Sequence, residues 1–405
     1  MKILQIAHKP PVPGIDGGCL AMRQITNSLL KAGADVKVIS LTTAKHPIVQ
    51  SKEFIQYCDK TRFESVFVDT KVTLIKIVKS FKNSLQAYRF FSKEMGQKLK
   101  TLFLQEEFDI VILESIFMGN YIKIIKKYSH ARIILRVHNV EYLIWERLSK
   151  QTNPIKKIMY HYLANSLKRF ELSLFNHIDG YMPITEVDHI FFKTKFPNLN
   201  SKVIPFSIEL SDYPYKKHKI SESKVSLFHI GSMNWQPNIE GMNWFLTHIW
   251  EKITEKYPQL SLVLAGKGNK RLFEKKFSRS NVKIFDFVED AQQFINEYDI
   301  MIVPLLSGSG MRIKIMEGLA LGKPIITTTI GAEGIDISDK VNIFIADTPE
   351  IMIQTIDFCV NHIEKCEEIG KNARKLIENK YSQEVVTKDL MEFLKGIVSF
   401  IQDKN

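Results

Sequence analysis

The chain has 405 residues and a mass of 46.9 kDa, more than one ordinary hydrophobic core accommodates, which indicates two or three domains. Its 45% hydrophobic and 25% charged residues are typical of a globular protein and exclude disorder as the main state. No apolar run approaches the roughly 18 to 20 residues that span a bilayer, and the first residues lack the features of a signal peptide. The four scattered cysteines argue against a disulfide framework or a zinc site, so we expect a cytoplasmic protein.

The net charge of +12 is unevenly distributed along the chain. Residues 1–210 contain 31 lysines and arginines against 18 acidic residues, whereas residues 211–405 contain 25 against 26. The excess of positive charge therefore belongs to the first half. This asymmetry indicates an anionic partner for that half, such as a nucleic acid, a membrane surface or a phosphorylated substrate, and a solvated basic surface is the alternative.

The first half alternates short apolar strands with helical stretches. A Pro/Gly loop follows the first predicted strand, and a helix is predicted from there to about Lys31. The chain also has two long basic and aromatic helical segments, 71–105 and 154–176. Apolar strands separated by helices predict a parallel sheet that is covered on both faces. The predicted strands are Lys2–His8, Ala34–Leu41, Phe108–Ser115, Arg132–Asn139, Ile178–Thr185 and Lys202–Phe206.

Residues 207–224 are polar and resemble a linker, after which the alternation begins again. The second set of predicted strands is Val225–Gly231, Leu260–Gly266, Val282–Val288, Asp299–Leu305 and Pro324–Thr328, followed by helical sequence to about Ile401. The fold class is therefore α/β, with two Rossmann-like doubly wound domains. We predict a first domain at 1–212 and a second at 213–382, with a terminal helix at about 383–405 that packs back on the first. Ligands bind such sheets outside the carboxyl ends of the strands, so we expect the site in a cleft between facing domains.

Several common motifs are missing from the sequence. It contains no GxxxxGK[ST], HExxH or GxSxG motif, no metal-ligand cluster and no Asp-x-Asp. The informative stretch is 299–333, where a predicted strand leads into the glycine turn 307–310 and a helix is predicted to begin at about Met311. A glycine turn before a helix presents free backbone N–H groups and the positive end of the helix dipole. Ser309, Gly310 and Met311 therefore belong to a candidate anion site.

Three charged residues follow this turn. Arg312 and Lys314 fall in the first helical turn, where cations oppose the dipole unless an anion is bound. Each charge-assisted hydrogen bond to a diphosphate would contribute about 1.5–3 kcal/mol. Glu317 lies three residues after Lys314, so the two side chains share a face of the helix, and its carboxylate could accept hydrogen bonds from a ribose. An ordinary surface Lys–Glu pair is the alternative.

This stretch resembles the donor-binding segment of retaining GT-B glycosyltransferases, in particular glycosyltransferase family 4. That family commonly carries E-x7-E here. Glu317 matches the second glutamate, which the resemblance implies binds the nucleotide ribose. Ser309 takes the place of the first, which usually contacts the donor sugar or phosphates. In a subset of the family that reads GSGxRxKxxE, the phosphate charge is supplied by residues at the positions of Arg312 and Lys314.

Other segments extend the resemblance over nearly the whole chain. Residues 229–258 are similar to a family pattern G-S-M-x-W-x-P-N that places Gly231 at the donor. Lys267 lies in the turn after the next strand, and the family lines its base pocket with the segment that ends at Val288. The loop 11–18 is similar to the family's Pro/Gly loop, where Gly17 and Gly18 would approach the diphosphate and the acceptor. A simple turn, or a solvated Lys267, is the alternative.

One histidine carries the candidate chemistry of the first half. His138 follows the predicted strand Arg132–Asn139, and the resemblance implies that it lies near the donor sugar and the reaction centre. Glu141 is a further, weaker candidate. By resemblance, His138, Arg312 and Lys314 are the catalytic residues, and the anomeric configuration is retained, with no enzymatic nucleophile visible.

The resemblance implies transfer of a sugar from a nucleotide-diphosphate sugar to a hydroxyl of a glycan or polyprenyl-phosphate-linked acceptor, in cell-envelope polysaccharide or glycoconjugate synthesis. No cofactor or metal is expected, and no nucleic acid partner. The basic, aromatic-rich segment Lys76–Lys98 is a candidate contact with an anionic membrane surface, which predicts a peripheral position at the inner face of the membrane. The alternatives are a nucleotide-sugar epimerase, a non-catalytic subunit of a glycosyltransferase complex, and a nucleic-acid-binding protein.

Overall fold

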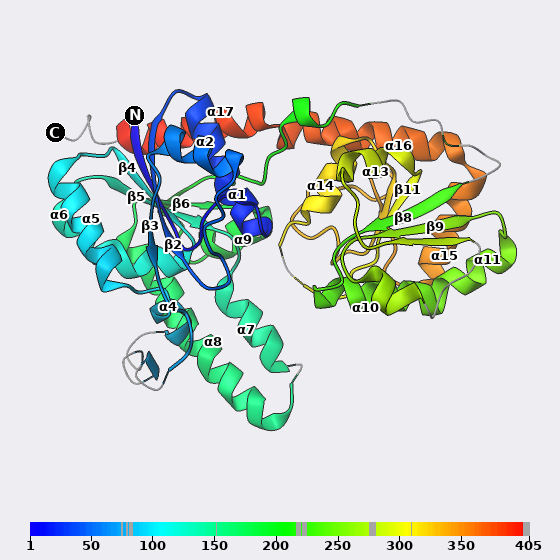
Figure 1. The fold of residues 1–405 in the computed structure, drawn as a ribbon, viewed down its shortest axis with the longest axis horizontal. Helices are drawn as coiled ribbons and strands as arrows, with labels where there is room; N and C mark the ends of the chain where they lie inside the picture. Colours follow the sequence, from blue (N-terminus) through cyan, green and yellow to red (C-terminus); the bar gives the residue numbers. More distant parts are fainter. Residues whose placement is uncertain are drawn as a thin grey trace. The chain divides into compact units, whose positions relative to one another are not determined.

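The computed structural model describes residues 1–73, 76–77, 80, 84–150, 152–215, 220, 225–274, 281–308 and 310–399 (Figure 1). The chain divides into two compact units. Unit 1 comprises Met1–Phe206 and Val386–Asn405, and unit 2 comprises Ser207–Val385. The boundaries predicted from the sequence, after residues 212 and 382, lie six and three residues from these divisions. Each unit is an α/β domain with its own sheet.

The sheet of unit 1 has seven parallel strands in the order β3-β2-β1-β4-β5-β6-β7. Alternate residues of its central strands enter two separate hydrophobic clusters, as shown by Leu4 and Ile6 in one cluster and Ile3 in the other. The sheet is therefore buried on both faces, as its continuous apolar strands predict. Its strands are β1 (Lys2–Ala7), β2 (Asp35–Thr42), β3 (Glu64–Phe67), β4 (Ile110–Glu114), β5 (Arg132–Val137), β6 (Gly180–Pro183) and β7 (Asn200–Ser201).

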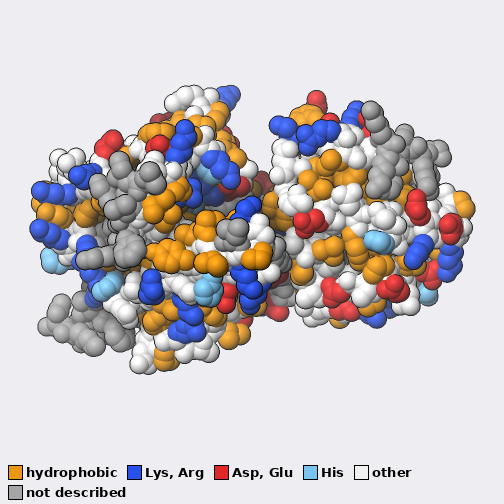
Figure 2. Space-filling view, turned by 90° about the horizontal axis from the view of Figure 1, so that it is seen from below, with side chains coloured by type: hydrophobic (Ala, Val, Ile, Leu, Met, Phe, Trp, Pro, Cys, Tyr) orange, Lys and Arg blue, Asp and Glu red, His pale blue; other side chains and the backbone are white. Residues whose placement is uncertain are grey.

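Helices cover both faces of this sheet, and two of them, α7 and α8, extend away from it (Figure 1). Lysine and arginine side chains are spread over the face of unit 1 seen in Figure 2. The helices are α1 (Gly17–Lys31), α2 (Lys52–Thr61), α4 (Leu85–Tyr88), α5 (Lys93–Gln105), α6 (Ile122–Tyr128), α7 (Glu141–Lys150), α8 (Pro154–Leu174) and α9 (Glu186–Lys193), with short 3-10 segments η1 (Ile116–Tyr121) and η2 (Phe175–His177).

The last helix, α17 (Gln383–Ser399), packs on unit 1 although it follows unit 2 in the chain. Its buried side chains Val386, Leu390, Leu394 and Ile397 recur at intervals of three or four residues and join the cluster beneath β1, β4 and β6. One apolar stripe of a helix thus closes a sheet face that would otherwise be open to water.

The sheet of unit 2 has six parallel strands in the order β10-β9-β8-β11-β12-β13. This is the same order as that of the first six strands of unit 1, with the strand order reversing on either side of the first strand. The strands are β8 (Ser226–Ile230), β9 (Ser261–Ala265), β10 (Val282–Phe285), β11 (Ile300–Val303), β12 (Ile325–Thr327) and β13 (Phe344–Ile345).

The helices of unit 2 connect its strands and close its hydrophobic core around Trp250 and Phe245. They are α10 (Gln236–Phe245), α11 (Glu251–Lys256), α13 (Ala291–Glu297), α14 (Ile313–Ala320), α15 (Pro349–Asn361) and α16 (Ile363–Leu376), with the 3-10 segment η3 (Leu210–Asp212) and the π segments η4 (Leu246–Trp250), η5 (Lys270–Glu274) and η6 (Ile377–Tyr381). In the described part of the chain, no helix combines the length and apolar character needed to cross a membrane.

Two predictions of secondary structure are wrong. The segment 71–105 is not one helix, because α4 ends at Tyr88 and α5 begins at Lys93, and part of the stretch lies outside the described residues. The cause is tertiary: the Tyr121 hydroxyl accepts a hydrogen bond from the Ser92 backbone N–H at 2.8 Å and donates one to the Phe90 carbonyl at 2.9 Å. The basic segment Lys76–Lys98 is therefore interrupted.

Residues 202–206 do not form the predicted strand, since ladder pairing with β6 ends at Ser201. The chain beyond stays extended and is anchored at intervals, because the Ile204 backbone N–H donates to the Pro183 carbonyl at 2.9 Å. The apolar pattern there reflects burial of Ile204 and Phe206 at the edge of the sheet.

Candidate active site

Both units place their candidate residues at the point where the strand order reverses. In unit 1 this is the carboxyl end of β1 and β4, and in unit 2 it is the carboxyl end of β8 and β11. Open α/β sheets bind ligands at this position, because the loops from neighbouring strands diverge there and leave a crevice. The two candidate sites are described separately below.

In unit 2, Gly231 directly follows β8 and marks the centre of the site. A β-carbon built on Gly231 would lie 2.5 Å from the Lys314 Nζ and 2.8 Å from both Asn238 Nδ2 and His229 Nε2. Side chains from β8, α10 and α14 therefore converge on one backbone position that only glycine leaves open. The sequence predicts Gly231 and Lys314 for the donor site, and the structure brings them together.

Lys314 is the cation closest to Gly231 in this site. Its Nζ donates a hydrogen bond to the Asn238 Oδ1 at 2.9 Å. Burial, followed by the neighbouring Arg312 guanidinium, lowers the pKa of Lys314 to about 7, although Glu317 opposes the effect. Its protonated form is thus held at an energetic cost, which a bound anion would offset.

Arg312 is the N-cap residue of α14, which begins at Ile313 rather than at the predicted Met311. Its side chain is 6% exposed, and its guanidinium lies over the Trp235 ring at 5.4 Å from the centroid. Burial lowers its pKa, and the charge of Glu333 opposes this. The guanidinium is held by stacking on an aromatic face, which fixes its orientation.

The glycine turn before α14 takes the backbone conformation that the sequence predicts. Gly308 and Gly310 have φ of 107° and 85°, in the left-handed region that glycine adopts without strain. A β-carbon on Gly308 would lie 3.0 Å from the Arg312 Nη2, so the turn also makes room for the guanidinium. Met311 is half-buried, and Ser309 lies outside the described residues.

Glu317, the predicted ribose ligand, is half-buried on α14. Its Oε1 accepts a hydrogen bond from the Tyr213 hydroxyl at 2.9 Å. Burial raises the pKa of Glu317, whereas the Tyr213 hydrogen bond and Lys314 lower it. Tyr213 was not predicted, because it lies 104 residues away in the segment between the sheets.

Lys267 and Val288 flank this corner less closely. Lys267 is exposed on a turn between Gly266 and Gly268, which have φ of 122° and 90°, and its carbonyl accepts a hydrogen bond from the Met233 backbone N–H at 2.8 Å. Val288 is half-buried three residues after β10. The structure thus ties the Lys267 backbone to the loop after β8, while its ammonium group faces solvent.

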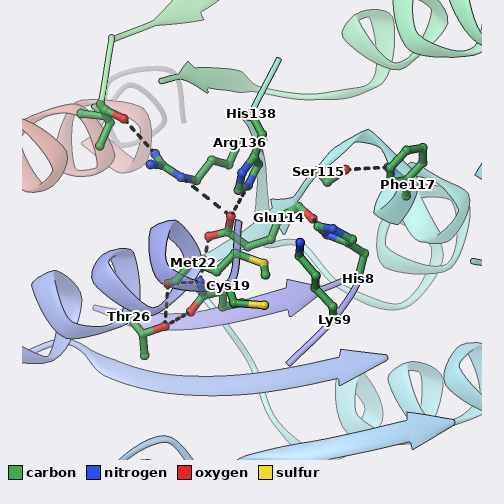
Figure 3. Close-up of polar contacts among 12 residues, drawn as sticks. His8, Lys9, Cys19, Met22, Thr26, Glu114, Ser115, Phe117, Arg136 and His138 are labelled. Carbon is green, nitrogen blue, oxygen red and sulfur yellow. Dashed lines mark hydrogen bonds and ion pairs between the residues drawn. The ribbon is translucent and has the colours of Figure 1, made fainter. Parts of the chain in front are cut away.

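In unit 1, a fully buried carboxylate organises the candidate residues (Figure 3). Glu114 ends β4, and its Oε1 accepts a hydrogen bond from the Gln5 side-chain amide at 2.7 Å. Its Oε2 lies 3.0 Å from the His138 Nε2 and 3.8 Å from the Arg136 Nε. Arg136 in turn donates to the Ile204 carbonyl at 3.1 Å. The buried charge is therefore paired and hydrogen-bonded on several sides.

These contacts fix the orientation of His138. Burial lowers its pKa, although Glu114 raises it, so the imidazole is neutral at physiological pH. The Glu114 carboxylate accepts hydrogen bonds from its other neighbours, so it acts as an acceptor toward His138 as well. The neutral His138 ring therefore carries its proton on Nε2, and this N–H donates a hydrogen bond to Glu114. The Nδ1 lone pair is then the accepting group that His138 can offer to a ligand.

His8 is a second histidine at this point, and the sequence analysis did not predict it. Its ring centroid lies 6.3 Å from that of His138, and its Nδ1 is 3.0 Å from the Glu114 carbonyl oxygen. Burial, Lys9 and His138 lower the pKa of His8 to about 3, so it is neutral as well. Both Glu114 and His8 stand at the ends of apolar strands, and this is the signal that could have identified them.

Gly17 and Gly18 are the first residues of α1 and not loop residues as predicted. Asp16 caps the helix by accepting a hydrogen bond from the Cys19 backbone N–H at 3.0 Å. A β-carbon on Gly18 would lie 2.8 Å from the Lys9 Nζ. Local capping by Asp16, which outweighs the freedom of the two glycines, draws them into the helix.

Among the described residues, Asp16, Cys19 and His46 bring three possible metal ligands within 4.8 Å of one another. The Lys9 ammonium already donates to both Asp16 carboxylate oxygens, at 2.7 and 2.8 Å. Burial raises the pKa of the Cys19 thiol to about 11, so the thiolate that a metal prefers is disfavoured. The Asp16 carboxylate is therefore already paired with a cation.

Glu141, the weaker candidate of the first half, begins α7. Its backbone N–H and that of Tyr142 donate to the buried Glu171 carboxylate, at 3.0 Å each. Burial raises the pKa of Glu171 to about 8 and that of Glu141 to about 7. Glu171 thus acts as a helix cap supplied by the neighbouring helix α8.

The comparisons with known proteins agree with this architecture. Residues 224–362 match the family Glycosyl transferases group 1. A Klebsiella pneumoniae protein, described as an uncharacterized 44.6 kDa protein in the cps region, is 23% identical and covers 95% of this chain and 97% of its own length. The structure of Anabaena HepE in complex with UDP matches with a TM-score of 0.67 at 14% identity, over 98% of this chain and 100% of that chain. Sucrose-phosphate synthase from Thermosynechococcus elongatus matches with a TM-score of 0.69 at 11% identity, over 98% and 99%.

Two Rossmann-like units with this strand order, in tandem, define the GT-B fold, which the chain shares with these solved structures. The similarity to the family Glycosyl transferases group 1 lies in residues 224–362. The matched segment contains Gly231, Arg312, Lys314 and Glu317. The residues that converge at the switch point of unit 2 are thus part of the segment that matches this family.

Proposed function

We propose that the protein transfers a sugar from a nucleotide-diphosphate sugar to a hydroxyl group of a glycan or lipid-linked acceptor, with retention of the anomeric configuration. The nucleotide binds to unit 2 and the acceptor to unit 1. The Klebsiella relative is described as encoded in a cps region, which supports a role in polysaccharide or glycoconjugate synthesis.

The observation that carries this proposal is the convergence at Gly231. The Lys314 ammonium, with its pKa lowered to about 7, and the stacked Arg312 guanidinium lie at the N-terminal end of α14. Two cations at the positive end of a helix are unfavourable by themselves and favourable around a diphosphate. As the glycosidic bond breaks, negative charge develops on the leaving diphosphate, and these fixed groups stabilise it without reorganisation.

The remaining contacts to the donor follow from the same placement. Glu317 accepts hydrogen bonds from the ribose hydroxyls, with Tyr213 holding its carboxylate, and the segment ending at Val288 contacts the base through its backbone. Ser309, Gly310 and Met311 offer backbone N–H groups to the phosphates, and Lys267 is a further cation for them. HepE holds UDP in its structure, so uridine diphosphate is the first nucleotide to test.

In unit 1 we propose that His138 accepts a hydrogen bond from a hydroxyl of the donor sugar through Nδ1, while Glu114 holds its Nε2. Gly17 and Gly18, at the amino end of α1, present backbone to the sugar and diphosphate. Because Arg312 and Lys314 supply the positive charge, the reaction requires no metal. We further propose that the enzyme works at the inner face of the membrane, where lipid-linked acceptors are found.

The test is a titration of the purified protein with UDP, GDP and ADP by calorimetry, followed by assays of sugar transfer in EDTA-treated buffer. We expect binding of one nucleotide that is lost in the Glu317→Ala and Lys314→Ala variants, and transfer that EDTA does not abolish. Proton NMR of the product reports the anomeric configuration. A nucleotide that binds both variants as tightly as it binds the unchanged protein would disprove the assignment of the donor site.

The same assays separate the alternatives. A non-catalytic subunit would bind the nucleotide sugar without turnover, and an epimerase would convert the sugar without an acceptor. Release of UDP that depends on an added acceptor distinguishes a transferase from both.

A further inference from the structure

We propose that the distal end of the α7–α8 hairpin is the surface by which this protein docks on an anionic lipid bilayer. The proposal rests on the membrane association put forward above and assigns it to the α7–α8 hairpin instead of the segment Lys76–Lys98 that the sequence predicts. The hairpin extends from unit 1 beyond the helices that cover the sheet (Figure 1). Four observations support the assignment.

The first is a gradient of burial along α8. In its C-terminal half, Leu167, Glu171 and Leu174 are buried against unit 1. In its N-terminal turns the described side chains are exposed, apart from the half-buried Tyr160, whose ring meets that of Trp145 on α7 at 5.8 Å. This aromatic contact joins the two helices near their free end. The tip is therefore a braced structure with little contact to the core.

The second is the chemistry of the exposed side chains at this end. Ile158 is 75% exposed, and Met159 and Tyr162 are about half exposed, all within one turn of α8, with Leu148 exposed on α7. Exposing large apolar groups together is unfavourable in water, and such patches mark surfaces that meet another apolar phase. A tyrosine among aliphatic residues is typical of the boundary between acyl chains and headgroups.

The third is the charge around this patch. Between residues 147 and 170 the chain has six basic residues and no aspartate or glutamate. Hydrophobic side chains lie among lysine and arginine side chains on the face of unit 1 that Figure 2 shows, which is the side toward which the hairpin extends. The basic residues are Arg147, Lys150, Lys156, Lys157, Lys168 and Arg169.

The fourth is the position of two of these lysines. Lys156 and Lys157 are exposed in the first turn of α8, which contains no acidic residue, and Asn153 caps the helix. Cations at this end oppose the helix dipole, whereas negative groups near them are stabilised. Lipid phosphates around the lysines would supply that negative charge, while the apolar side chains enter the acyl boundary. A nucleic acid would match the charge but leave Ile158 and Met159 in water.

The experiment uses the full chain and vesicles of phosphatidylcholine with or without 30–40% phosphatidylglycerol, about the composition that gives a strong anionic surface. Co-sedimentation should detect binding to the anionic vesicles and much weaker binding to neutral ones. The double variant Ile158→Glu/Met159→Glu should bind at least tenfold more weakly, because apolar burial and charge attraction are both lost. Lys156→Gln/Lys157→Gln should lose about fivefold per lysine and flatten the salt dependence.

The matched control is Leu104→Glu on α5, which makes the same kind of change at a side chain of 67% exposure elsewhere on unit 1. It should bind vesicles like the unchanged protein. Equal vesicle binding by the Ile158→Glu/Met159→Glu variant and the control would overturn the proposal, as would a wild-type protein that ignores anionic vesicles. If the Ile158→Glu/Met159→Glu variant kept its vesicle binding but changed its oligomeric state in light scattering, the proposal would be overturned, and the patch would be the contact with a second copy of the chain. UDP titration of the same variants tests the donor site independently.

Discussion

The two candidate sites occupy the same topological position in two sheets of the same strand order, yet their electrostatics differ. In unit 1 the charges are matched internally, since Glu114 lies between Gln5, Arg136 and His138. In unit 2, Lys314 donates to the neutral amide of Asn238 beside a second cation, Arg312. One switch point is built around a buried carboxylate, and the other brings two cations together near Glu317 and Glu333.

This difference assigns different work to the two units. A balanced, buried network keeps a side chain in one orientation and does not need a ligand to be stable. A pair of close cations has a free-energy cost that a ligand relieves, which turns ligand binding into stabilisation. The proposed function accordingly assigns the oriented imidazole to unit 1 and the nucleotide to unit 2. This contrast between the two sites is contradicted if the variants of one unit affect UDP binding in the same way as those of the other.

The largest effect is expected from the cations of unit 2. Lys314→Ala or Arg312→Ala should lower the turnover number by about 10²–10³-fold, because a preorganised charge on the leaving diphosphate is lost. UDP affinity should fall in both variants. Steady-state kinetics and calorimetry measure the two effects, and Lys252→Ala, which removes an exposed cation from α11 of unit 2, is the matched control. Equal losses in the control would mean that general charge, rather than this corner, attracts the nucleotide.

Variants of Glu114 and His138 in unit 1 should have a lower turnover number but an unchanged affinity for UDP. His138→Ala should lower the turnover number by about 10²-fold, a typical contribution of one positioned catalytic group. Glu114→Gln keeps the shape but replaces one of the two acceptor oxygens that face Gln5 and His138 with an NH2 donor, and should cost about tenfold in turnover and about 1–3 kcal/mol of stability. The dissociation constant of UDP should stay within about twofold in both variants. A large loss of UDP affinity would contradict the division of labour.

The pH dependence of UDP binding tests the lowered pKa of Lys314. Above pH 7 the free protein has lost this proton, whereas a bound diphosphate favours the protonated lysine, so binding must take up a proton. Affinity should therefore fall by up to about tenfold per pH unit above 7. Without nucleotide, the unfolded chain holds this proton to a higher pH than the folded one, so the contribution of Lys314 to stability rises with pH above 7. Calorimetry from pH 6.5 to 8.5 checks the first effect, and Lys314→Met should abolish it.

Much of this arrangement could be predicted from the sequence, because strands, glycine turns and the residues that follow them are local signals. Gly231 and His138 are predicted from the family resemblance, and Glu317 from the resemblance together with its helical spacing from Lys314. Glu114 was missed because its partner lies 24 residues away on a neighbouring strand, and Tyr213 because it reaches Glu317 across 104 residues. The break between α4 and α5 depends on hydrogen bonds from Tyr121, which no local pattern reveals.

The smallest effects are expected from alanine substitutions at two glycines that each lie close to a lysine side chain. A β-carbon on Gly231 would lie 2.5 Å from the Lys314 Nζ, and one on Gly18 would lie 2.8 Å from the Lys9 Nζ. Either lysine can move its flexible end away, but Gly231→Ala must also displace Asn238 and the buried His229, so the thermal stability of this variant is measured beside its affinity. Gly231→Ala should weaken UDP binding several-fold, because it displaces the ammonium from the diphosphate position, a change worth about 1 kcal/mol.

Gly18→Ala should leave UDP affinity within about twofold and lower the transfer rate several-fold, since under the proposed function the amino end of α1 contacts the donor sugar. It should also stabilise unit 1 by up to about 1 kcal/mol, because alanine favours the helix more than glycine does. Calorimetry, transfer kinetics and thermal unfolding of the two variants give the comparison directly. If Gly18→Ala weakened UDP binding as much as Gly231→Ala, the nucleotide would depend equally on both switch points, and the contrast between a site built on a carboxylate and one built on two cations would no longer explain how the two units divide their work.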